Sequence, residues 1–164
     1  MPLFLVLGLL GCGAPEHQAT IDLPPEPPVD VSRPVENPAL VQALGVREVG
    51  RPVDQQASLV RELNRAVYLL PVPAEGAPAT TRVIMYRDGR GGDWVPLFTD
   101  WQQMRAWTQR PVQPLVLPAG AAWDFALRDE SAAGAVIDPA AYRLSLDRET
   151  LERLKNEAAP DARR

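Results

Sequence analysis

The hydrophobic positions of this chain fall into three zones with different patterns. An apolar run from Leu3 to Leu10 is interrupted only by Gly8, and a polar, proline-rich stretch then continues to about residue 36. From Asn37 onward, apolar residues recur every three to four positions or gather in short runs. The first spacing predicts amphipathic helices and the second predicts strands. We therefore expect one folded domain over residues 37–157, followed by a frayed tail over 158–164.

Within the domain, the pattern predicts helices that alternate with strands. Helices are expected near residues 38–44, 53–65, 99–109, 119–127 and 144–156, and strands near 67–72, 82–86, 94–98, 114–118 and 135–137. This order predicts a mixed α/β or α+β fold, in which a mostly short-stranded sheet is covered by helices in a single small domain.

Several residues mark the expected ends of these elements. Asn37 is expected to cap the first helix, and Thr99 and Gln102 match a capping box at the start of the third. The glycines of residues 88–93 predict a hairpin turn, because glycine accepts the positive φ angles of such turns. Pro96 predicts that its strand lies at a sheet edge or contains a bulge, since proline donates no hydrogen bond to the ladder.

The first apolar run ends in Leu9-Leu10-Gly11-Cys12. It is too short to cross a bilayer, which needs roughly 20 apolar residues, but its length suits the core of a signal peptide. Its end resembles the lipobox of bacterial lipoproteins, which implies cleavage between Gly11 and Cys12 and acylation of Cys12. We therefore expect residues 1–11 to be a lipoprotein signal peptide. The alternative is a buried apolar segment with an ordinary cysteine.

The stretch after Cys12 predicts a tether and a location. Seven of the 18 prolines fall between Pro15 and Pro38. Residues 12–36 are therefore expected to be a disordered, extended spacer of ~3.1 Å per residue near polyproline II, with a docking motif for a proline-reading domain as the alternative. Gly13 is not the aspartate of an enteric inner-membrane retention signal, so the expected location is the cell envelope, at the outer rather than the inner membrane.

Composition narrows the chemistry that this domain can carry. The chain holds one cysteine and one histidine, Cys12 and His17, and both precede the predicted domain. Nucleophilic or acid–base catalysis by these side chains, and the commonest zinc ligands, are therefore not expected in the domain. The net charge of −4 argues against nucleic-acid binding, which needs a basic face. We expect no cofactor, no metal and no catalytic residue.

Four aspartates at predicted turns and caps leave two alternatives open, and they are Asp88, Asp93, Asp100 and Asp138. Turn chemistry explains them without a ligand, because aspartate bonds readily to nearby backbone amides. Together they could instead hold a hard cation such as calcium, although the spacing of residues 88–93 is not that of an EF-hand. A glycosidase-like carboxylate pair is possible in principle, but the sequence singles out no two partners.

A series of motifs along the chain points to a known family. In chain order they are residues 59–63 leading into 67–72, then 95–100, 104–107, 115–118, 135–139 and 144–154. This order resembles the N-terminal domain of the SseB family over roughly residues 53–155, and Leu97-Phe98-Thr99-Asp100 is its most specific segment. Asp138-Pro139 departs from the usual Asn-Pro. The resemblance implies a fold and a non-enzymatic role, since no catalytic residues are established for the family.

The candidate partner-binding residues are Trp101 and Trp107. Aromatic side chains often anchor protein interfaces. These two are six positions apart and do not share one face of a helix, so one can lie in the core while the other is exposed. The alternative is that most of the four tryptophans belong to the core. The expected function is a membrane-anchored lipoprotein that presents an SseB-like domain to a protein or peptide. The alternatives are a carboxylate-based cell-envelope hydrolase and a passive structural lipoprotein.

Overall fold

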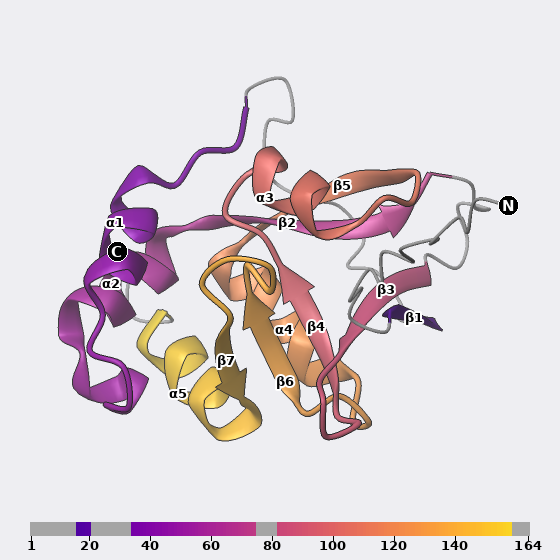
Figure 1. The fold of residues 1–164 in the computed structure, drawn as a ribbon. Helices are drawn as coiled ribbons and strands as arrows, with labels where there is room; N and C mark the ends of the chain where they lie inside the picture. The colour runs from indigo at the N-terminus through magenta and orange to yellow at the C-terminus, as the bar shows by residue number, and fades with distance from the viewer. Residues whose placement is uncertain (1–15, 21–33, 75–81, 159–164) are drawn as a thin grey trace, which may run out of the picture.

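The computed structural model describes residues 16–20, 34–74 and 82–158, which form two sheets and five α-helices (Figure 1). The strands are β1 (Glu16–Thr20), β2 (Val67–Pro73), β3 (Arg82–Arg87), β4 (Asp93–Leu97), β5 (Val112–Pro118), β6 (Gly134–Ile137) and β7 (Leu144–Asp147). The helices are α1 (Pro38–Val46), α2 (Ala57–Arg65), α3 (Trp101–Trp107), α4 (Ala119–Arg128) and α5 (Arg148–Ala158), with a 3-10 turn η1 (Val53–Gln55). The predicted fold class is confirmed.

The larger sheet has the strand order β1-β3-β4-β6-β7. β4 and β6 are parallel neighbours, and every other pair in this sheet is antiparallel. Because the parallel strands point the same way, their carboxyl ends meet at one end of the sheet, and the hairpin that joins β3 to β4 lies at the other (Figure 1). The main core packs one face of this sheet against α4 and α5, with Trp123, Phe125 and Leu151 fully buried.

The smaller sheet is an antiparallel ribbon of β2 and β5 that contains four prolines. Ala74 N donates to Pro111 O at 3.1 Å, and Ala119 N donates to Ala66 O at 3.1 Å. With the strand register, these bonds place every proline at a position whose backbone groups point away from the partner strand. No ladder bond between the strands is therefore lost at Pro71, Pro73, Pro114 and Pro118.

The position of Pro96 corrects one prediction. β4 is the third of five strands and not an edge. Asp138 N donates to Leu97 O and Ala133 N to Asp93 O, so the ring nitrogen of Pro96 points toward the β3 side. Pairing with β3 is confined to Asp93 and Trp94. Pro96 lies beyond that pairing, where no N–H is needed.

Two predicted helices have different boundaries in the structure. The helix expected over 53–65 is divided into η1 and α2. The helix expected over 144–156 is wrong in its first turn, because Leu144–Asp147 forms β7 and α5 begins only at Arg148. Asp147 caps α5 by accepting a hydrogen bond from Thr150 N at 2.9 Å. Leu146 is buried in the core as predicted, because the apolar and polar residues of Leu144–Asp147 alternate in a way that fits a strand as well as a helix.

The segment expected to be a disordered tether contributes a strand. Glu16–Thr20 forms β1, which pairs antiparallel with β3 and places His17 opposite Met85. The tether prediction is therefore wrong for these five residues, and a histidine does belong to the sheet. The predicted signal peptide, Cys12 and residues 21–33 lie outside the described residues. Within the described part of the chain, no helix is long and apolar enough to cross a membrane.

Candidate functional site

The four tryptophans occupy four different environments. Trp123 is fully buried and donates to Asn64 Oδ1 at 2.9 Å. Trp107 is half-buried against Phe98, with ring centroids 5.3 Å apart. Trp94 is half-buried in the larger sheet, whereas Trp101 is 40% exposed at the start of α3. Of the two candidate partner-binding residues, Trp101 therefore faces solvent, and Trp107 packs against the body of the domain.

Trp101 borders a groove of about 420 Å³ between α3 and the loop that leads into β5. The residues that line it are Trp101, Arg105, Thr108, Gln109, Arg110, Pro111 and Val112. The Arg105 guanidinium carbon lies 5.8 Å from the centre of the Trp101 ring, which is within the range of a cation–π contact. The groove thus combines an aromatic surface with two arginines.

The start of α3 differs from the predicted capping box by one residue. The N-cap is Asp100, whose Oδ1 accepts a hydrogen bond from Gln103 N at 2.8 Å. Thr99 was expected to cap this helix, but it is fully buried and turned toward β6. This residue is free for another role because Asp100 satisfies the helix terminus.

Thr99 joins the carboxyl ends of the two parallel strands through Asp138. Thr99 N donates to Asp138 Oδ1 at 3.0 Å, and Thr99 Oγ1 donates to Asp138 Oδ2 at 2.7 Å. Asp138 is 1% exposed and has a left-handed φ of 45°. Burial raises the pKa of Asp138 from 3.8 to about 6; the Thr99 bonds oppose this rise, and the charge of Asp100 adds to it. The sequence did not reveal this contact.

Asn37 holds the same region from the side of α1. It occupies the predicted N-cap position, but its side chain makes no capping bond. Instead, Asn37 Nδ2 donates to Val67 O at 2.7 Å and to Thr99 O at 2.6 Å, and Val67 N donates to Asn37 Oδ1 at 3.1 Å. The capping prediction is therefore wrong in its bonds. Asn37 ties α1 to β2 and to Thr99, two residues before α3, and it thereby supports the element that carries Trp101.

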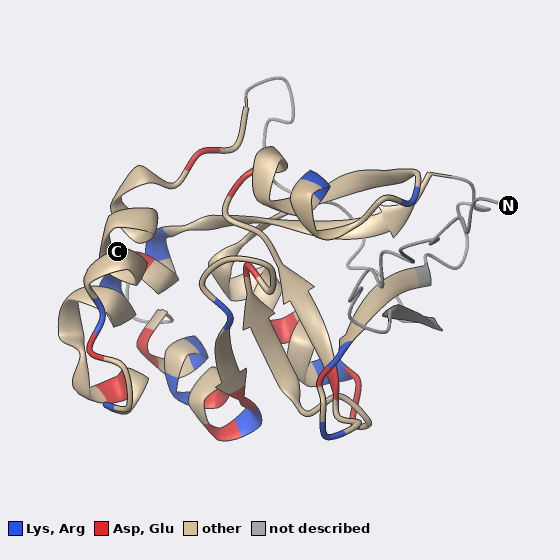
Figure 2. Ribbon diagram, in the orientation of Figure 1, with Lys and Arg blue, Asp and Glu red and all other residues tan. Residues whose placement is uncertain are grey.

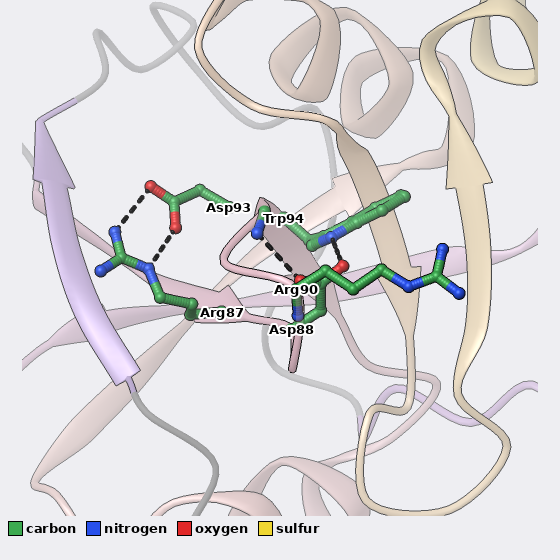
Figure 3. Close-up of polar contacts among 6 residues, drawn as sticks. Arg87, Asp88, Arg90, Asp93 and Trp94 are labelled. Carbon is green, nitrogen blue, oxygen red and sulfur yellow. Dashed lines mark hydrogen bonds and ion pairs between the residues drawn. The ribbon is translucent and has the colours of Figure 1, made fainter.

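The other two candidate aspartates lie at the hairpin between β3 and β4 (Figure 3). Asp93 forms a two-pronged ion pair with Arg87, with bonds of 2.8 and 3.1 Å. Asp88 accepts from Trp94 Nε1 at 3.0 Å and from the backbone N–H groups of Arg90 and Gly92 at 2.8 Å each. The hydrogen bonds from these two backbone N–H groups are the main cause of the lowered pKa of Asp88. This arrangement is turn chemistry of the kind the sequence predicted.

The four aspartates do not converge on one point. Asp88 and Asp93 lie at the hairpin end of the sheet, and Asp100 and Asp138 lie at the opposite end. Among the described residues, no three His, Cys, Asp or Glu side chains gather as a metal site would require. The arrangement therefore gives no support to the calcium alternative.

Two other hollows are larger than the Trp101 groove. One of about 490 Å³ lies between α2 and the end of α5, and one of about 470 Å³ lies between η1, β7 and Trp94. Arginines that line them are already in ion pairs. Arg61 of the first hollow contacts Glu62 at 3.0 Å, and Arg153 of the second contacts Asp54 at 3.5 Å. Trp101 is the most exposed tryptophan, so the groove beside it is the better candidate for binding.

The fold and site define a small α+β domain whose two parallel strands end in a buried Thr–Asp pair, two residues before an exposed tryptophan. The family model of the SseB protein N-terminal domain matches residues 40–153, so this chain belongs to the SseB family. No match was found among the curated proteins or among the solved structures. The predicted resemblance is confirmed, and two of its motifs, Thr99-Asp100 and Asp138-Pro139, meet through the Thr99–Asp138 bonds.

Proposed function

We propose that this chain is a lipoprotein of the bacterial cell envelope, at the outer rather than the inner membrane, anchored through acylated Cys12. Its SseB domain binds an extended, acidic segment of a partner protein in the Trp101 groove and does so without catalysis. The observation that carries the proposal is the position of Trp101, which stays 40% exposed beside Arg105 and Arg110.

The chemistry of the groove favours such a segment. An exposed tryptophan next to arginines can cover an apolar side chain of the partner and bind a neighbouring carboxylate. The backbone groups of Val112 at the end of the groove point away from β2, by the same register argument that places the prolines. An extended peptide is therefore offered side-chain contacts along α3 and main-chain contacts at β5.

The placement of the carboxylates supports binding over hydrolysis. A carboxylate-based hydrolase needs a general acid with a raised pKa in a cleft that the substrate enters. The carboxylate with the clearly raised pKa is Asp138, and it is 1% exposed and bonded to Thr99. Asp147 does line a hollow, but hydrogen bonds from Thr150 lower its pKa. Among the described residues, the carboxylate with the raised pKa and the accessible hollows thus lie in different places.

Acylation is tested by labelling cells with radioactive palmitate. The native chain should take up label and appear in the membrane fraction, because multiple acyl chains anchor stably. The Cys12→Ala variant should take up none and remain unprocessed. Label in that variant equal to the native level would overturn the anchor.

Peptide binding is tested by selecting short random peptides on the immobilised native chain. Enriched peptides should pair an acidic residue with an apolar one, and Trp101→Ala or Arg105→Ala should weaken their binding at least tenfold. Val49→Ala is the matched control, because it removes an 89% exposed apolar side chain elsewhere. Peptides that bind the native chain and Trp101→Ala equally would contradict the assignment of the groove.

A further inference from the structure

The pairing of β1 decides which end of the domain lies near the proposed lipid anchor. Glu16, the first residue of β1, stands opposite Tyr86, and Thr20 stands opposite Arg82. The start of β1 therefore lies beside the hairpin between β3 and β4, and not beside α3. Cys12 precedes Glu16 by only four residues. At ~3.5 Å per residue, that segment reaches about 14 Å at most.

We propose that the hairpin end of the larger sheet, with Arg90 at its tip, is the surface that this protein lays against phospholipid headgroups. The inference rests on the proposed acylation of Cys12 and adds to it an orientation of the domain. A lipid attached within about 14 Å of β1 leaves little freedom for the opposite end of the sheet to face the bilayer.

The chemistry of the tip suits a headgroup surface. Arg90 is exposed, and Figure 3 shows its side chain running beside the Trp94 indole. Its backbone N–H donates to Asp88, which fixes the turn that carries this exposed side chain. A guanidinium in that position can bind a lipid phosphate with paired hydrogen bonds and keep its alkyl stem over the turn.

The charge of this end shows that the anchor, and not a basic patch, would bring it to the membrane. Figure 2 shows blue and red segments side by side at the hairpin. The loop between α4 and β6 reaches the same end, since Ala133 N donates to Asp93 O at 2.7 Å. The charged residues here are Arg87, Arg90, Arg128 and Arg148 against Asp88, Asp93, Asp129, Glu130 and Asp147, and Glu16 begins β1 at the same end. This end therefore carries no excess of positive charge, so the chain without its lipid should not bind vesicles.

The orientation has a consequence for the Trp101 groove. β4 runs from the hairpin to the start of α3, so the groove lies at the end of the sheet that faces away from the bilayer (Figure 1). A partner could then reach it from the compartment without crossing the membrane surface. The distance between domain and lipid is set by the four residues before β1, and the proline-rich residues 21–33 follow β1 along the chain.

The test uses a single fluorophore on the acylated chain in vesicles. Acylation blocks the thiol of Cys12, so a cysteine placed at Gly89 or at Gln102 is the one reactive thiol. A side chain at Gly89 meets no atom within 4 Å, and Gln102 is an exposed position on α3. The vesicles contain phosphatidylcholine, phosphatidylglycerol and a lipid with a spin-labelled headgroup. We expect quenching at position 89 to exceed that at position 102 at least threefold; equal quenching, or stronger quenching at 102, would overturn the orientation.

A second variant separates the orientation from the anchor. Gln18→Pro with Ala19→Pro disrupts β1 pairing on both alternating sides of the strand. Flotation with the vesicles should be unchanged, while quenching at position 89 should fall to the level at 102. Persistent quenching at 89 would mean that β1 does not orient the domain. If the native chain does not float with vesicles, the proposed acylation fails and the orientation fails with it; flotation with equal quenching rejects the orientation alone.

Discussion

Asp88 and Asp138 lie at opposite ends of the same sheet, and their pKa values are shifted in opposite directions. Both carboxylates accept hydrogen bonds from backbone and side-chain donors. The pKa of half-buried Asp88 is lowered by those bonds, whereas the pKa of fully buried Asp138 is raised to about 6. The difference shows that desolvation outweighs hydrogen bonding once a carboxylate leaves water.

The same difference separates two structural tasks. At the hairpin, solvated charges shape a turn, and Asp88 can lose a bond to water at small cost. At the other end, Asp138 is the acceptor for two buried donors of Thr99, and water cannot replace Asp138 there because Thr99 is not exposed. We therefore expect the Asp138 end to be rigid and sensitive to substitution, and the hairpin end to be tolerant.

The largest effect is expected from Asp138→Ala, which leaves Thr99 N–H and Oγ1–H buried without their acceptor. Leaving two buried donors without an acceptor should lower the free energy of unfolding by about 3 kcal/mol. Urea denaturation measures this loss. Asp138→Asn is the matched control, because its Oδ1 still accepts from Thr99 N and its amide can donate to Thr99 Oγ1. Equal losses in the two variants would contradict this account of the pair.

The next effect is a pH dependence caused by Asp138. Its pKa is 3.8 when it is unperturbed and about 6 in the folded chain, so the folded state binds the proton more tightly. Stability from this group is therefore full below about pH 4 and is lost as pH rises through 6, by about 3 kcal/mol in all. Unfolding free energies measured from pH 4 to 7 should decline in the native chain, and Asp138→Asn should remove that decline. The lowered pKa of Asp88 acts in a different window, below about pH 4.

A smaller effect is expected from Asn37→Ala. This change removes the acceptor of Val67 N and one donor to two carbonyls in a half-buried site, so the loss should be about 1 kcal/mol. Asn37→Asp keeps the Oδ1 acceptor but turns a carboxylate oxygen toward the carbonyl oxygens of Val67 and Thr99, so it should lose at least as much stability as the alanine variant. A stability unchanged by Asn37→Ala would show that α1 is held by its apolar residues alone.

The smallest effect is expected at the hairpin from Asp88→Ala. The change removes three hydrogen bonds, but all of its donors lie where water can replace the carboxylate. The loss of stability should be clearly below that of Asp138→Ala, with a change in the near-ultraviolet circular dichroism of Trp94. A loss as large as that at Asp138 would remove the distinction between the two ends.

The sequence predicted the elements whose signal is local. Strands β2, β3 and β6 follow from short apolar runs, and the hairpin follows from its glycines. β1 was missed because Glu16–Thr20 is polar and has no local strand pattern. It is a strand because it pairs with β3, which is distant in the sequence. The Thr99–Asp138 pair was missed because it depends on the parallel pairing of β4 with β6, and local patterns do not encode which strands become neighbours.

The sequence allowed the inference that one of the two tryptophans is exposed, but the groove beside it could be predicted only in part. The spacing of Trp101 and Trp107 excluded a shared helical face, and the structure places one in solvent and the other against Phe98. The contribution of residues 108–112 could not be predicted, because it depends on how the loop before β5 folds back along α3.

The central claim is that the two ends of this domain face different partners, and photo-crosslinking in cells tests it most directly. Benzoylphenylalanine is placed at Gln109, which lines the groove, or at Gly89 on the hairpin, in cells whose phospholipids carry radioactive phosphate. We predict a discrete protein adduct from position 109 that disappears with Trp101→Ala, and a radioactive lipid adduct from position 89. A protein adduct from position 89 with none from position 109 would contradict the account.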